Sequence, residues 1–252
     1  RVFMVTRVWE FTGEEVVVPE TQIEAVRQRI VDLLPTTFCS DDRFRSDGYD
    51  SLVKCVMDAI GSVGVRYTAV KNGLIKFEKF CQTSGLGLIR TPAEFLNAFA
   101  PHLSDGEWLA TNLWNRHRTA PRNGILKVEA MVRWFVILDR HGIQTPQQLV
   151  AQVANPLLKR ELLAVPGQSE FVSLIYFFML ANYRDGVKDD RMVERWFETT
   201  CGLFISTAHK AVILMEVAEL LRDQYPCLTA AELDHLIWLV QSDRWSPGRG
   251  FH

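Results

Sequence analysis

The sequence predicts an all-α protein of two interleaved helical subdomains, with one short β-hairpin at the N-terminus. Three observations predict this class. Apolar residues recur at helical spacing from residue 21 onward, the segments between these runs are short and carry Gly, Pro or N-capping residues, and only residues 2–18 alternate with a period of two. The 252 residues, 48% of them hydrophobic, are enough to bury a core without a structural metal.

The first two elements are the hairpin and one helix. Residues 2–18 are rich in Val, and Thr12 and Gly13 in their middle supply the turn. Apolar residues then follow a helical period: Ile23, Val26, Ile30, Val31 and Leu34. Thr21 can cap this helix, and Pro35 ends it.

Every later periodic segment also predicts a helix, and Pro at helix starts or Gly after helix ends limits several of them. These segments are residues 49–62, 68–82, 92–100, 104–113, 124–141, 146–153, 156–164, 169–183, 191–200, 207–224 and 229–242. The sequence contains no internal repeat and no low-complexity linker. We therefore expect interleaved subdomains rather than separate domains on a string.

The charge balance argues against a protein whose whole surface binds a polyanion. The chain has 28 Lys and Arg residues against 30 Asp and Glu residues, a formal net charge of -2. A local basic face is compatible with this balance, and four residues in and after the loop at residues 115–123 can form one: Arg116, Arg118, Arg122 and Lys127. Such a run is also typical of an ordinary solvated loop.

The cysteines and histidines indicate neither disulfides nor a metal centre. The five cysteines are scattered, without a CxxC pair or a histidine at ligand spacing, which is typical of reduced thiols in a cytoplasmic protein. The six histidines form no close pairs, so no catalytic metal is expected. The longest strongly apolar stretch, residues 171–181, is too short to span a bilayer, so we expect no membrane partner.

A tight turn between two apolar helices carries the first chemical signal. Val165, Pro166 and Gly167 join these helices, and Gly permits an unusual backbone conformation there. The turn is expected to expose the backbone N–H groups of Gly167, Gln168 and Ser169 at a helix N-terminus, where a phosphate fits. An ordinary junction between two helices explains the same residues.

An acidic pair, Asp189 and Asp190, precedes the helix predicted at residues 191–200. An aspartate at this place is often only an N-cap. The order of the features gives the pair more weight, because a turn suited to phosphate and a strongly apolar helix come before a carboxylate at a helix start.

This order resembles the helix-hairpin-helix superfamily of base-excision DNA glycosylases, called HhH-GPD for the hairpin, its Gly/Pro-rich loop and the following aspartate. Residues 165–169 match the loop. Asp190 matches the aspartate, because Val193 then occupies the position of the family's branched aliphatic residue. Looser similarity at residues 49–70, 123–128 and 234–238 extends the resemblance over residues 45–242.

The resemblance implies a division of the chain into three segments. Residues 1–48 form the hairpin and a helix that join the C-terminal subdomain, residues 49–164 form a subdomain like a six-helix barrel, and residues 165–252 hold the hairpin exit, the catalytic helix and the last helices.

Departures from the family pattern narrow the expected chemistry. Ser169 replaces the second hairpin glycine, and Phe171 stands where bifunctional members carry a Schiff-base lysine. Without that amine no imine forms, so no lyase step is expected. The cysteine cluster of the iron–sulfur branch is missing, so no cofactor is expected. Gly64 stands where several members have a wedge glutamine, which leaves the wedge residue open.

The resemblance implies a monofunctional DNA glycosylase that acts as a monomer on double-stranded DNA. Asp190 would stabilise positive charge on the sugar or take a proton from the attacking water, and the hairpin would bind a DNA phosphate. Two alternatives remain open: a helix-hairpin-helix DNA-binding protein without catalysis, and an unrelated all-α protein in which Asp190 only caps a helix.

A flipped base also needs aromatic walls. The candidates are Tyr67, Trp114, Trp134, Tyr176 and Trp196. Tyr67 is preferred, because it follows a helix end in the segment that borders the family's pocket. For each of the five, packing in a core is the common alternative.

Overall fold

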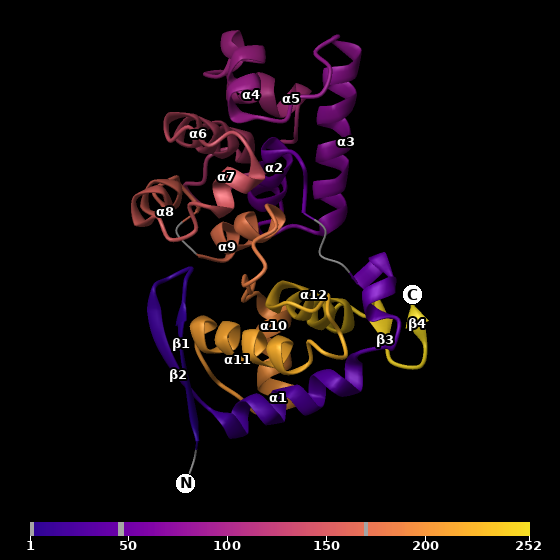
Figure 1. The fold of residues 1–252 in the computed structure, drawn as a ribbon. Coiled ribbons are helices and arrows are strands. Elements are labelled where there is room, and N and C mark those ends of the chain that lie inside the picture. Colours follow the sequence, from indigo (N-terminus) through magenta and orange to yellow (C-terminus); the bar gives the residue numbers. More distant parts are fainter. Residues whose placement is uncertain (1–2, 45–47, 169–170) are drawn as a thin grey trace. The chain divides into compact units, whose positions relative to one another are not determined.

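The computed structural model describes residues 3–44, 48–168 and 171–252, which form twelve α-helices and two small two-stranded sheets (Figure 1). This content confirms the predicted all-α fold with an N-terminal β-hairpin. The chain divides into two compact units: Arg1–Asp47 with Tyr183–His252 form unit 1, and Gly48–Asn182 form unit 2. The chain returns to unit 1 after Asn182, later than the boundary expected at residue 165, so both helices of the predicted hairpin belong to unit 2.

Unit 1 is built around one helix that is buried on nearly every side. Its elements are β1 (Met4–Trp9), β2 (Glu14–Pro19), α1 (Glu20–Leu33), η1 (Phe38–Ser40), η2 (Asp42–Phe44), α10 (Arg191–Cys201), α11 (Thr207–Leu220), α12 (Ala230–Gln241), β3 (Trp245–Ser246) and β4 (Gly250–Phe251). The β1–β2 hairpin, α1 and α12 all pack against α11 (Figure 1). Because α11 is apolar around most of its circumference, it takes the central place.

The β1–β2 hairpin follows the alternation of the sequence. Met4 pairs with Pro19 and Trp9 with Glu14, and Gly13 has a positive φ in the turn. Val16 and Val18 are fully buried on the face that meets α11, whereas Val17 is exposed. The short C-terminal hairpin of β3 and β4 was not predicted, since two-residue strands leave no periodic pattern.

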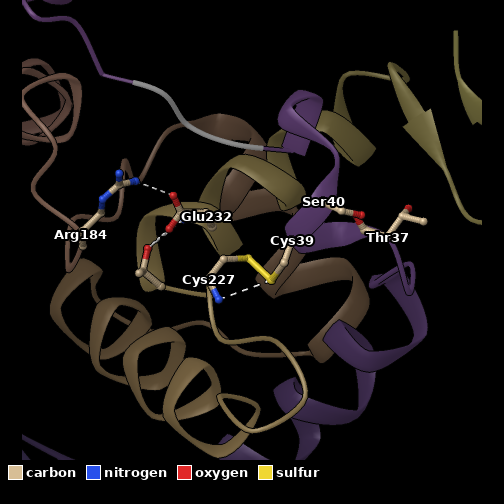
Figure 2. Close-up of a disulfide and its surroundings, with 7 residues drawn as sticks. Thr37, Cys39, Ser40, Arg184, Cys227 and Glu232 are labelled. Carbon is tan, nitrogen blue, oxygen red and sulfur yellow. Dashed lines mark hydrogen bonds and ion pairs between the residues drawn. A yellow bond between two sulfur atoms is a disulfide. The ribbon is translucent and has the colours of Figure 1, made fainter.

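A disulfide between Cys39 and Cys227 contradicts the prediction of five reduced thiols (Figure 2). The two residues are 188 positions apart in the sequence, and their Cα atoms are 5.6 Å apart. Scattered spacing could not reveal this pair, because only the fold brings η1 and the segment before α12 together. Cys55, Cys81 and Cys201 are free thiols. The cytoplasmic location stays a prediction.

Unit 2 packs its helices around α2. Its elements are α2 (Leu52–Gly61), α3 (Tyr67–Thr83), α4 (Pro92–Ala98), η3 (Ala100–His102), α5 (Gly106–Asn112), α6 (Lys127–Arg140), α7 (Pro146–Val150), α8 (Pro156–Leu163) and α9 (Phe171–Leu180). Helices α3, α4, α6 and α9 all contact α2 (Figure 1). Side-chain caps start α2, α4, α5, α7 and α8, which explains why their starts could be predicted closely.

Helix α6 begins at Lys127, three residues later than predicted. Arg118 and Leu126 form an isolated antiparallel bridge, and Thr119 N–H donates to the Ile125 carbonyl at 2.9 Å. These bonds hold the preceding residues in a closed loop. Among the described residues, no helix combines the length and apolar character needed to cross a membrane.

Candidate functional site

Asp190 is the N-cap of α10 and uses one carboxylate oxygen for this purpose. Its Oδ1 accepts the backbone N–H groups of Met192 at 2.8 Å and Val193 at 3.3 Å. Within the described residues, Oδ2 makes no hydrogen bond or ion pair, and the side chain is half-buried. The helix N-terminus favours the negative charge, so a rigidly held carboxylate keeps one oxygen available.

Asp189 is fully engaged within unit 1. Its Oδ1 lies 2.6 Å from Lys210 Nζ, and its Oδ2 accepts the Thr207 hydroxyl at 2.5 Å. Lys210 is only 3% exposed, so its ammonium needs this carboxylate as a partner. Of the two neighbouring aspartates, only Asp190 therefore has a charge that no cation compensates within the described part of unit 1.

Asp234, on α12, is a third carboxyl in unit 1 that sequence reasoning missed. It is 5% exposed, the backbone N–H of Lys188 donates to it, and its Oδ1 has no hydrogen-bond partner in the described part of the chain. Burial raises the pKa of Asp234 well above its ordinary value, and the charge of Asp190 raises it further. An aspartate among the buried apolar residues of a helix is the signal that could have drawn attention to it.

The predicted hairpin is present in unit 2, and its turn is closed by an internal bond. Gly167 has a φ of +81°, and Pro166 and Gly167 are exposed. The N–H of Gln168 donates to the Val165 carbonyl at 3.0 Å, and its side chain is buried. Gln168 is therefore not the predicted phosphate ligand, because the turn consumes its donor. Ser169 lies outside the described residues.

The turn lies directly against the basic loop at residues 115–123. A Cβ atom on Gly167 would be 2.3 Å from Cβ of Thr119, so only glycine permits this approach. The contact brings together two segments that the sequence separates by nearly fifty residues. Thr119 Oγ1 is buried there and has no hydrogen-bond partner among the described residues.

Three of the four predicted basic residues are exposed, and the fourth is not. Arg116 pairs with Glu107 at 3.0 Å, Arg118 Nη1 donates to the Gly124 carbonyl at 2.8 Å, and Arg122 has no partner among the described residues. Lys127 is buried, which corrects its assignment to a DNA-facing surface.

Lys127 instead binds the end of α2. Its Nζ donates to the carbonyls of Gly61 at 2.7 Å and Val63 at 2.6 Å. The Gly61 carbonyl is an orphan acceptor at the C-terminus of α2, where a cation is favoured, and Val63 follows the C-cap Ser62. The lysine has a structural role that local sequence could not disclose.

The aromatic candidates separate into core and surface residues. Trp114 packs under Gly61 in the core of unit 2, Trp134 Nε1 donates to the Leu162 carbonyl at 3.0 Å, and Trp196 is buried in unit 1. Their burial contradicts a role as base-pocket walls. Tyr67 and Tyr176 are half-buried and remain candidates.

Tyr67 and Tyr176 belong to a tyrosine cluster around Asp58, which is fully buried on α2. Tyr49 donates to Asp58 Oδ2 at 2.7 Å, Tyr176 donates to Oδ1 at 3.3 Å, and the hydroxyls of Tyr49 and Tyr67 hydrogen-bond to each other. Burial and the charge of Asp58 raise the pKa values of Tyr49 and Tyr176, which keeps both as donors. Sequence reasoning missed Tyr49 and Asp58.

Other parts of the predicted site add little. Gly64 has a positive φ and open space where a side chain would be, so nothing there identifies a wedge. Among the described residues, no group of three or more His, Cys, Asp or Glu side chains could hold a metal ion.

The fold and these residues define a mostly helical protein of two units, one presenting a carboxylate at a helix start and the other a helical hairpin. The chain belongs to a family described as a domain of unknown function (DUF8548), whose model matches residues 34–242. The matched range contains the disulfide, the helical hairpin of α8 and α9, Asp190 and Asp234. It does not include the β1–β2 hairpin. No curated protein and no solved structure matches the chain.

Proposed function

We propose that the protein is a monofunctional DNA glycosylase, which hydrolyses the bond between a damaged or modified base and deoxyribose in double-stranded DNA. The unequal engagement of two neighbouring carboxylates carries the proposal. Lys210 neutralises Asp189, whereas Asp190 keeps an available oxygen at the start of α10. The resemblance of residues 165–190 to the HhH-GPD superfamily supplies the reaction class.

Asp190 acts on the sugar in this proposal. Cleavage of the glycosidic bond develops positive charge on deoxyribose, and a nearby carboxylate stabilises that charge or takes a proton from the attacking water. The two bonds from the α10 backbone fix the carboxylate beforehand, so it needs no reorganisation during the reaction.

The absence of a lyase step follows from Phe171, the first residue of α9. An imine with the sugar requires an amine at the attacking position, and a phenyl ring has none. The product is therefore an abasic site in an intact strand.

The DNA-contacting surface of unit 2 combines the hairpin turn with the basic loop. The close approach of Gly167 to Thr119 supports a joint surface, because it places the exposed turn beside exposed arginines of the loop. Arg122, which has no partner in the described structure, contributes the most available charge. Binding by such a surface weakens as the salt concentration rises.

Tyr67 and Tyr176 supply the aromatic contact to the base. Their hydroxyl groups are held in the cluster around Asp58, which fixes the rings in place. Fixed aromatic rings stack on a flipped base at low cost in conformational entropy.

Asp190→Asn tests the role of the negative charge without removing the helix cap, because Asn is about as good an N-cap as Asp. Base release from duplexes with alkylated, deaminated or oxidised bases is followed by mass spectrometry, and the strands are then treated with hot alkali. We expect release to fall by about a hundredfold or more. Strand scission before the alkali treatment contradicts a monofunctional enzyme.

Asp105→Asn is the matched control, because Asp105 caps α5 and accepts the Trp108 N–H at 2.9 Å. It makes the same chemical change at an N-cap of unit 2 and should leave base release unchanged. Equal release by wild type and Asp190→Asn removes the assignment of Asp190.

A non-catalytic DNA-binding protein is the second candidate, and Gly64 favours it. Gly64 brings no side chain to the position of the family's wedge residue. This candidate predicts salt-dependent binding to duplex DNA without release of any base.

A further inference from the structure

The loop that leads into α10 is held by α12 and α11 together. Ala231 N–H, at the start of α12, donates to the Arg184 carbonyl at 3.0 Å, and Arg184 Nη1 contacts Glu232 at 2.5 Å (Figure 2). Further along, Asp189 is fixed by its ion pair with Lys210 on α11. The loop therefore has an anchor at its beginning and another just before Asp190.

Lys188 is the centre of this loop, and its backbone is bound on both sides. Its N–H donates to Asp234, and its carbonyl accepts the N–H of Asp190 at 2.6 Å. A continuous path of hydrogen bonds thus joins Asp234 to the backbone of Asp190.

We propose that Asp234 is a positioning residue for Asp190, which holds the Lys188 N–H and thereby fixes the loop that presents the Asp190 carboxylate. The effect on catalysis rests on the proposed glycosylase function, whereas the effect on the loop does not.

The surroundings of Asp234 favour the protonated carboxyl. Asp190 and Asp189 contribute negative charge, and Lys188 a positive one. On α10, which packs against α12, Arg191, Glu194 and Arg195 are exposed and Glu198 is half-buried. Lys210 on α11 is paired with Asp189, and Asp42 and Arg43 on η2 are exposed. Burial of a charged carboxylate with an unpaired oxygen costs free energy, so this environment favours the protonated form of Asp234.

Two variants separate the acceptor from the charge. Asp234→Asn keeps an oxygen for the Lys188 N–H and carries no charge, whereas Asp234→Ala removes the acceptor. Glu216→Gln is the matched control, because Glu216 is a half-buried carboxyl of α11 whose partner, Arg7 on β1, lies outside this loop.

Amide hydrogen exchange at Lys188 measures the positioning directly. We expect exchange in Asp234→Ala to be about tenfold faster or more, and unchanged in Asp234→Asn and Glu216→Gln. Unchanged exchange in Asp234→Ala overturns the proposal. This measurement needs no enzyme activity. It therefore tests the positioning of the loop even when the wild type releases no base and the proposed function fails.

Kinetics of base release distinguish positioning from general stabilisation. Asp234→Ala should lower kcat by about tenfold with little change in KM, and Asp234→Asn should keep wild-type kcat. If Asp234→Ala does not fold, Asp234→Leu, which fills the space but also lacks the acceptor, takes its place. A wild-type kcat in the folded variant without the acceptor overturns the proposal.

Discussion

Lys127 shows that the surroundings of a residue decide its role. Its ammonium group is buried against two carbonyls at the end of α2, and burial lowers its pKa from 10.5 to about 8. At pH values between about 8 and 10.5, the Lys127 side chain binds a proton more often in the unfolded chain than in the folded one. The contribution of Lys127 to the free energy of unfolding therefore rises with pH in this window and is lost as the pH falls through about 8.

Lys127→Met should therefore destabilise the protein in a pH-dependent way. We expect the free energy of unfolding to fall by about 1–3 kcal/mol, because two carbonyls lose their donor. The loss should be larger at about pH 9 than at about pH 7. Urea unfolding at both pH values measures it, and the exposed Lys79→Met should show no such difference. A loss independent of pH contradicts this account.

Asp189 and Asp190 show the same dependence on partners. The two side chains are chemically identical and adjacent, yet one is paired with a buried lysine and the other caps a helix. Val193 indicated Asp190 from the sequence. The ion pair of Asp189 supplies an independent physical reason for the same choice.

At the scale of elements, the hairpin of α8 and α9 depends on a glycine for two separate reasons. Gly167 has a positive φ, and it also lies against Thr119 so closely that no side chain fits. The first requirement comes from the turn itself. The second comes from a loop that belongs to another part of the sequence.

Gly167→Ala separates these two requirements when it is compared with Gly142→Ala. Gly142 has a φ of +69° but open space around the added methyl group. We expect urea unfolding to show a loss of about 2–4 kcal/mol for Gly167→Ala and about 1–2 kcal/mol for Gly142→Ala. Salt-dependent DNA binding should weaken only in Gly167→Ala. Equal losses of stability in the two variants would mean that the clash of the added methyl group with Thr119 does not destabilise the protein.

At the scale of the whole molecule, the disulfide joins the two chain segments that make up unit 1. Cys39 belongs to the N-terminal segment and Cys227 to the C-terminal one, and all of unit 2 lies between them in the sequence. A crosslink that closes so long a loop restricts the unfolded chain strongly.

Cys227→Ser should lower the free energy of unfolding by about 2–5 kcal/mol, measured without reductant. Cys201→Ser, which removes a half-buried free thiol, is the control and should change little. Thiol titration of the denatured wild type should detect the three free cysteines before reduction. Titration of every cysteine before reduction contradicts the disulfide.

The fold class and most element positions could be predicted because their causes are local. Helical spacing of apolar residues, N-capping side chains and the alternation of residues 2–18 all depend on neighbours within a few positions. The delayed start of α6 shows the limit, since a bridge between Arg118 and Leu126 overrides the local preference.

The sequence by itself determined the helices, the hairpin turn at Gly167 and Asp190 as the candidate carboxylate. Only the tertiary structure decided that Lys127 is buried, that Trp114 belongs to the core, and that Cys39 binds Cys227. It also brought Asp234 to the loop before α10. The physical reason is that burial, charge pairing and crosslinking depend on residues far away in the chain, whose approach no local pattern encodes.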